Sequence, residues 1–137
     1  MKTVDKYTLI SGNYYYYYIR ENSITTKPFS AKDMDYIEIM DQIRDYTLSN
    51  FPKFKEQLLV RLIYAYLSIF NQLIVLDNYK TKKEYKVLKN KLKDNYFKVV
   101  VNKKAPRNLK VAVLLLSINE GLYKFILSKY KKFESNQ

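Results

Sequence analysis

Residues 58–76 read LLVRLIYAYLSIFNQLIVL, and this stretch decides the fold because it is apolar around most of a helix circumference. The polar residues that interrupt it are Arg61, Ser68, Asn71 and Gln72. A membrane span needs about 20 apolar residues, so length alone allows one. The polar interruptions and two tyrosines are unfavourable against lipid and instead favour a buried helix. We therefore predict a mainly α protein with a long apolar central helix over residues 54–76.

The residues before this stretch predict a first helix over 30–49. Ser30-Ala31-Lys32-Asp33 fits a capping box, in which a serine oxygen and an acidic side chain satisfy the first backbone N–H groups. The apolar face is expected at Met34, Ile37, Met40, Ile43 and Thr47. Asn50 is expected to cap the next helix, with Pro52 in its first turn. The acidic residues Asp35, Glu38, Asp41 and Asp45 predict a solvated surface and no metal or acid–base site.

The residues after position 76 predict three further helices. Thr81-Lys82-Lys83-Glu84 fits a second capping box, followed by the apolar stripe Tyr85, Leu88 and Leu92. Residues 96–101 have strand propensity, but the flanking helices favour a short buried helical turn. Ala105-Pro106-Arg107 opens a helix to about Ile118, and Asn119-Glu120-Gly121 separates it from an amphipathic helix over 122–133. That last helix presents Leu122, Phe125, Ile126 and Tyr130 on one side. The expected fold is a bundle of about five helices.

Composition excludes several kinds of chemistry. The chain has 137 residues, one domain's worth, and contains neither cysteine nor histidine. Zinc sites with those ligands, cysteine nucleophiles and histidine relays are therefore excluded. The charge is uneven: residues 1–51 carry a net charge of −1, whereas residues 52–137 carry +13. The second part is a lysine-rich surface that faces either solvent or an anionic partner.

The stretch Asn13-Tyr14-Tyr15-Tyr16-Tyr17-Tyr18-Ile19-Arg20-Glu21-Asn22-Ser23-Ile24 differs from everything after it. Its tyrosines favour a short β-strand with large rings on both faces, and residues 4–10 offer at most one partner for a hairpin. A strand of this kind is expected to have hydrogen-bonded neighbouring strands on both edges. In an isolated chain we expect it to pair with a second copy, giving a homo-oligomer.

The pattern Tyr-x-Tyr-x-x-Arg-Glu-Asn-Ser-Ile at residues 15–24 resembles bacterial family 2 glycosyltransferases, in the region that follows their catalytic GT-A domain core. The resemblance covers nearly the whole chain and is most specific at residues 20–24. It implies that residues 1–29 are the edge of a GT-A domain and residues 30–137 a C-terminal helical domain. The chain departs from many relatives at Tyr18, where they carry a second arginine.

The resemblance implies a substrate-binding role for Arg20, Asn22 and Ser23, beside a nucleotide-sugar donor and a glycan acceptor. It implies no catalytic residue and no cofactor in this chain. The complete enzyme would use a divalent metal, Mn or Mg, held with the catalytic acid upstream of Met1, so the chain alone is expected to be inactive. The alternative for the same residues is a strand end, where Arg20 pairs with an acid and Asn22 and Ser23 make turn hydrogen bonds.

A second hypothesis is a stand-alone basic helical module that binds an anionic membrane surface or a protein partner. Nucleic-acid binding is disfavoured because the tyrosines gather in the less basic half of the chain, whereas stacking rings need phosphate-binding cations around them. The N-terminus has no apolar export segment. We expect a cytoplasmic location, with a peripheral position on the inner face of the cell membrane under the second hypothesis.

Overall fold

The computed structural model describes residues 28–134, which are 83% helical and contain no strand. The α-helices are α1 (Met34–Asn50), α2 (Lys55–Leu73), α3 (Lys83–Lys93), α4 (Tyr96–Val101), α5 (Arg107–Ile118) and α6 (Glu120–Glu134). Short 3-10 turns precede three of them at Ala31–Asp33, Pro52–Phe54 and Tyr79–Thr81. The prediction of a mainly α fold is confirmed, with six α-helices in this part in place of about five. The expected strand or hairpin lies outside the described residues.

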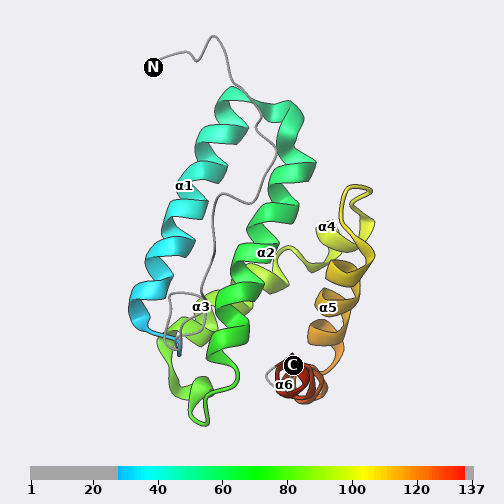
Figure 1. Ribbon diagram of the computed structural model, residues 1–137. Helices are drawn as coiled ribbons and strands as arrows, with labels where there is room; N and C mark the ends of the chain where they lie inside the picture. Colours follow the sequence, from blue (N-terminus) through cyan, green and yellow to red (C-terminus); the bar gives the residue numbers. More distant parts are fainter. Residues whose placement is uncertain (1–27, 135–137) are drawn as a thin grey trace, which may run out of the picture.

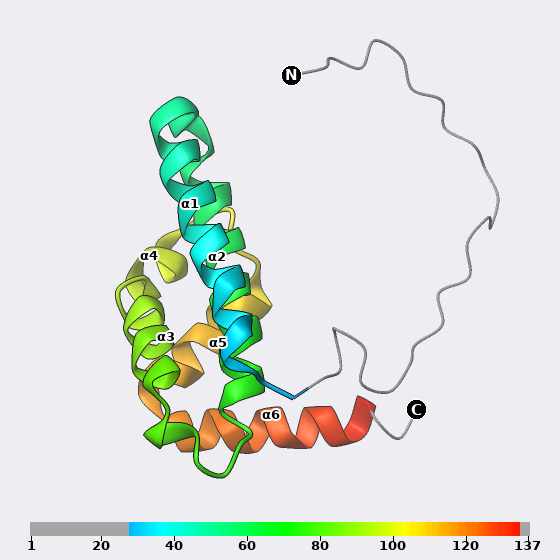
Figure 2. The same ribbon diagram turned by 90° about the vertical axis from the view of Figure 1, so that its left-hand side faces the viewer.

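The helices form two groups that meet along α2. α1 and α2 make a long antiparallel hairpin, and α3 crosses its lower half (Figure 1). α4 and α5 lie on the other side of α2, and α6 runs lengthwise along the base of the molecule (Figure 2).

Helix α2 contributes nine buried residues to the core. They are Leu58, Leu62, Ile63, Ala65, Tyr66, Leu67, Ile69, Phe70 and Leu73. Beyond its first turn, exposed positions recur only at Arg61, Tyr64 and Ser68, which lie one turn apart on a single narrow stripe. α2 ends at Leu73, before the predicted Leu76. The chain turns at Ile74, which stays fully buried.

The first helix begins at the predicted capping box. The Ser30 hydroxyl accepts a hydrogen bond from the Lys32 backbone N–H at 3.3 Å, and the Ser30 N–H donates to the Asp33 carboxylate at 2.7 Å. The predicted apolar face holds only in part, since Ile37 is 1% exposed but Ile43 is 44% exposed. A spacing of three residues falls short of a full turn of 3.6 residues, so repeated steps of three drift off the buried face.

Two predicted caps are wrong. Asn50 is the last residue of α1, and its side-chain amide donates back to the Tyr46 carbonyl; Pro52 does occupy the first turn of the next element. Thr81 ends a 3-10 turn, and its hydroxyl donates to the Asn78 carbonyl in place of capping α3. Lys82 takes the N-cap position of α3 and makes no side-chain cap. The predicted apolar stripe of α3 is nevertheless buried at Tyr85, Leu88 and Leu92.

The segment from 96 to 134 follows the predicted boundaries closely. Residues 96–101 are helical, although the expected burial is found only at Val99, while Phe97 is 78% exposed. Pro106 precedes α5, and α5 ends at Ile118. Asn119 then breaks the helix and accepts a hydrogen bond from the Leu122 N–H at 3.0 Å, which satisfies an early donor of α6.

Replacing Asn102 with alanine is expected to destabilise the fold by about 1–3 kcal/mol, the usual cost of leaving buried polar partners unpaired. The Asn102 side chain is buried, donates to the Glu56 carbonyl at 2.9 Å and accepts from the Lys104 N–H at 2.7 Å. It therefore ties the loop after α4 to the start of α2. Urea unfolding measures the loss, and Asn108→Ala, at an exposed position of α5, is the matched control. Equal stabilities of the two variants would contradict this role.

Candidate functional site

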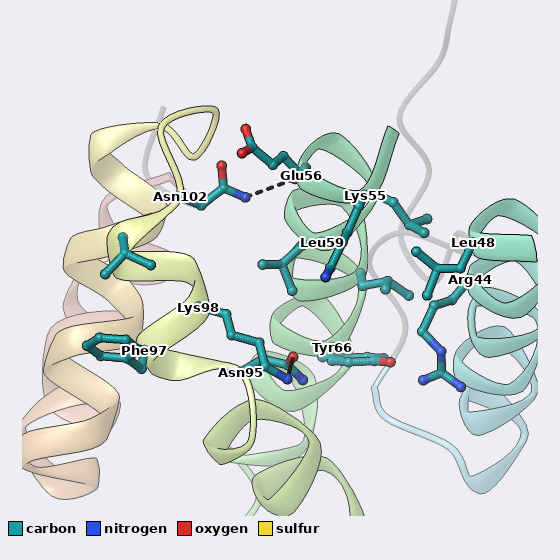
Figure 3. A pocket seen from close by; sticks show the side chains of 13 residues that line it. Arg44, Leu48, Lys55, Glu56, Leu59, Tyr66, Asn95, Phe97, Lys98 and Asn102 are labelled. Carbon is teal, nitrogen blue, oxygen red and sulfur yellow. Dashed lines mark hydrogen bonds between the residues drawn. The ribbon is translucent and has the colours of Figure 1, made fainter. Parts of the chain in front are cut away.

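A groove of about 720 Å³ lies between α1 and α4, with α2 as its floor (Figure 3). Its apolar lining is Leu48, Leu58, Leu59, Leu62, Phe97 and Val101. Its polar lining is Arg44, Lys55, Glu56, Tyr66, Asn95, Lys98 and Asn102. Leucines from adjacent turns of α2 form the base because positions 58, 59 and 62 share one side of that helix. The groove therefore combines an apolar base with three cationic side chains and one acid.

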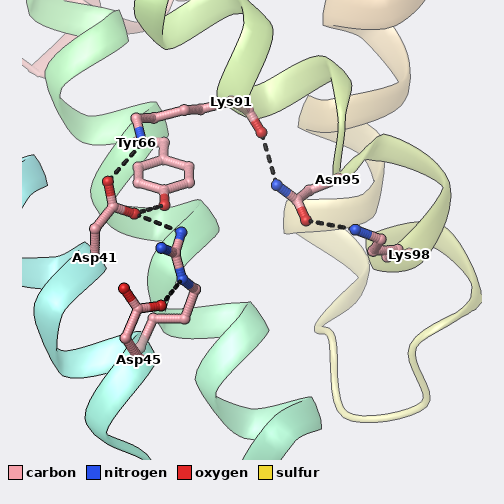
Figure 4. Close-up of polar contacts among 7 residues, drawn as sticks. Asp41, Asp45, Tyr66, Lys91, Asn95 and Lys98 are labelled. Carbon is pink, nitrogen blue, oxygen red and sulfur yellow. Dashed lines mark hydrogen bonds and ion pairs between the residues drawn. The ribbon is translucent and has the colours of Figure 1, made fainter. Parts of the chain in front are cut away.

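A polar network around Asp41 (Figure 4) adjoins this groove through two of its lining residues, Arg44 and Tyr66. The Asp41 carboxylate accepts hydrogen bonds from the Tyr66 hydroxyl and from the Lys91 ammonium group, each at 2.5 Å. The Arg44 guanidinium lies 2.9 Å from Asp41 and 2.8 Å from Asp45. One carboxylate thus joins α1 to α2 and α3, through partners 25 and 50 residues away in the sequence.

The network changes the proton affinities of its members. Burial by itself would raise the pKa of Asp41, but hydrogen bonds from Lys91 and Tyr66, with the charges of Lys91 and Arg44, lower it below its ordinary value. Burial, and then the hydrogen bond to Asp41, raises the pKa of the Tyr66 phenol. Near pH 7, Asp41 is therefore negatively charged and Tyr66 is a neutral hydrogen-bond donor to it.

The cations on the open side of the groove are less constrained. The Lys98 ammonium group has one long hydrogen bond, 3.4 Å to the Asn95 side chain. Within residues 28–134 the Lys55 ammonium group has no hydrogen bond or ion pair, and Figure 3 shows its side chain beside Leu59 at the groove. Arg44 is already neutralised by two carboxylates. Lys55 and Lys98 are thus the cations that remain available to an anionic group.

A second polar network fixes the start of α6. The Glu120 carboxylate accepts hydrogen bonds from Tyr79 at 3.0 Å and Tyr85 at 2.7 Å, and Lys89 lies 2.8 Å away. Burial would raise the pKa of Glu120, but the hydrogen bonds from Lys89, Tyr85 and Tyr79 lower it. Burial, followed by the bond to Glu120, raises the pKa of Tyr79 to about 12. The Lys124 ammonium group sits over the Tyr79 ring, 4.6 Å from its centroid.

The predicted substrate-binding residues Arg20, Asn22 and Ser23 lie outside the described residues, so their role stays a prediction. Sequence reasoning missed Asp41 as a structural carboxylate, since it assigned this residue to the solvated face of α1. The available signal was its place one turn after the buried Ile37 and three residues before Arg44, on one side of the helix.

Between residues 28 and 134 there is no group of three or more acidic, histidine or cysteine side chains that could hold a metal ion. Over the same residues, no helix is both long enough and apolar enough for a membrane span. Residues 33–35 have the sequence Asp-Met-Asp, which matches an Asp-x-Asp pattern. Both acids lie at the N-terminus of α1.

Comparison of the chain with protein-family models, with curated proteins and with solved structures gives no match in any of the three.

Replacing Asp41 with asparagine is expected to destabilise the fold near pH 7 by about 1–3 kcal/mol, because charge-assisted hydrogen bonds to two helices are weakened. The folded-state pKa of Asp41 is lowered, so its contribution is present above the ordinary pKa of 3.8 and is lost as the pH falls through the lowered folded value. The difference in unfolding free energy between wild type and Asp41→Asn should therefore shrink on acidification. Chemical unfolding at a series of pH values measures this.

The control is Asp77→Asn, an identical change at an exposed turn position. It should leave the unfolding free energy nearly unchanged at each pH. A constant difference between Asp41→Asn and wild type from neutral to strongly acidic pH would contradict the assigned role of Asp41.

Proposed function

We propose that this chain is the C-terminal helical part of a bacterial family 2 glycosyltransferase, which transfers a sugar from a nucleotide-sugar donor to a cell-surface polysaccharide or other glycan acceptor. The observation that carries the proposal is the pattern at residues 15–24, which resembles the region just after the GT-A core. The helical character of residues 31–134 is consistent with the C-terminal helices expected there.

In this proposal Arg20, Asn22 and Ser23 help to position the donor diphosphate or the acceptor. Arginine suits this role because its planar guanidinium can bind two phosphate oxygens at once. Asparagine and serine supply neutral hydrogen bonds to sugar or phosphate oxygens. The boundary near residue 29 would separate these residues from the helical domain that begins at the Ser30 cap.

The catalytic acid and the Mn or Mg site would belong to a GT-A core that this sequence does not include. Residues 13–20 would form a strand at the edge of that core, and α2 would be the central helix of the domain that follows. Without that core, such a strand would have unpaired backbone groups, and pairing between two copies of the chain would satisfy them.

The chain alone is expected to release no nucleotide from UDP-sugars or GDP-sugars in the presence of manganese, since in this proposal the acids that bind the metal and activate the acceptor belong to the GT-A core. Nucleotide release, measured against a protein-free blank, tests this. Reproducible release that depends on the protein would show that the catalytic machinery is present in these residues.

The origin of the chain is tested directly by the DNA upstream of the codon for Met1. A GT-A coding region there, in frame or shifted, supports the proposal, and an unrelated gene or a promoter region speaks against it. Where the core is found, joining it to this chain should give a glycosyltransferase whose turnover falls on Arg20→Ala. Lys27→Ala, at a cation of the same segment outside the pattern, is the matched control.

A further inference from the structure

Helices α5 and α6 turn an apolar face outward. Ile118 is 80% exposed and Phe125 is 60% exposed, which is unusual for side chains of this size within regular helices. The exposed aliphatic and phenylalanine side chains described in these two helices are Val111, Leu114, Ile118, Leu122, Phe125 and Ile126. We refer to these six residues as the α5–α6 apolar face.

The six residues follow the periodicity of the helices. Val111, Leu114 and Ile118 share one side of α5, and Leu122, Phe125 and Ile126 share one side of α6. α5 passes into α6 at Asn119, so the two sets follow each other along the chain (Figures 1 and 2). The opposite sides of both helices are already buried in the core, at Leu109, Val113, Leu116 and Tyr123. The outward side therefore remains without a partner within residues 28–134.

The charges of α5 and α6 are mainly positive. α5 contains no acidic residue, and its cations are Arg107 and Lys110. The only acid in α6 before Glu134 is Glu120, which is held by Lys89, Tyr79 and Tyr85. Lys129 is exposed and places its ammonium group 5.6 Å from the centroid of the Phe125 ring. Among their described side chains, α5 and α6 thus offer cations and no exposed carboxylate.

We propose that the α5–α6 apolar face binds the surface of an anionic lipid bilayer, with α6 lying in the plane of the interface. In that position Leu122, Phe125 and Ile126 enter the boundary between head groups and acyl chains. Lys129 extends its charged end back to the lipid phosphates while its aliphatic stem covers Phe125. The inference goes beyond the proposed glycosyltransferase origin and does not depend on it, since it uses only residues 107–130.

A second copy of the chain is a poorer occupant of the same face. A two-fold pairing through α6 would place Lys129 of both copies in one interface. No described carboxylate on the face could compensate these cations. Like charges juxtaposed in an interface oppose association. An anionic bilayer instead supplies both an apolar layer and negative charge.

Co-sedimentation of the full chain with vesicles tests the proposal. The chain should sediment with vesicles of equal parts phosphatidylglycerol and phosphatidylcholine, and far less with phosphatidylcholine alone. High salt should weaken the binding, because the attraction of exposed cations to the surface is screened. The double variant Ile118→Ser, Phe125→Ser should lower the vesicle affinity by about tenfold or more, since it removes two large apolar side chains from the contact.

The matched control is the double variant Ile39→Ser, Tyr46→Ser, which removes two similarly exposed apolar side chains from α1. It should bind the anionic vesicles as well as the wild type does. Circular dichroism of both double variants verifies that they remain helical. Equal loss in the two double variants, or equal binding to neutral vesicles, overturns the proposal. A further outcome also overturns the proposal: the wild type does not bind vesicles, self-associates by light scattering, and loses this self-association on Phe125→Ser. The occupant of the face is then a second copy of the chain.

Discussion

The burial of α2 is the constraint on which the rest of the described structure depends. Beyond its first turn, α2 exposes only a narrow stripe formed by Arg61, Tyr64 and Ser68. Other helices must therefore cover the rest of its circumference. Each fully buried leucine or phenylalanine contributes about 1.5–3 kcal/mol relative to exposure, which makes the covering favourable. α1, α3 and α4 provide direct contacts to α2, while α5 and Tyr123 of α6 extend the same core.

Two carboxylates then select one arrangement among those that would cover α2. The Asp41 carboxylate accepts hydrogen bonds from α2 and α3. The Glu120 carboxylate accepts hydrogen bonds from the 3-10 turn before α3 and from α3 itself. A partly buried carboxylate without donors is costly, whereas apolar contacts tolerate rotation and sliding. Each acid therefore fixes the rotation of its own helix. The apolar core supplies the stabilisation, and these acids supply the geometry.

Local signals in the sequence were sufficient for most helix boundaries and insufficient for the polar contacts. The Ser30 capping box, Pro52 and Pro106 act within a few residues, so the sequence alone locates the helices that follow them. Thr81 matched a capping box equally well, but its hydroxyl bonds to Asn78 in a turn that the pattern does not specify. Tyr66 and Lys91, the partners of Asp41 on other helices, are 25 and 50 residues away, and no local spacing reveals them. The predicted substrate-binding residues Arg20, Asn22 and Ser23 are untested for a different reason, since they precede the described residues.

The same distinction explains why one side of α6 is open. Its sequence is apolar on two sides, one with Tyr123 and Leu127 and the other with Leu122, Phe125 and Ile126, so amphipathicity alone does not decide which side packs inward. Glu120 in the first turn decides it, because its carboxylate must face the tyrosines and lysine that satisfy it. Residues 123 and 127 lie one and two turns further along that inward side. The remaining apolar residues are thereby turned outward, and a polar contact at one end of the helix determines the apolar surface along its length.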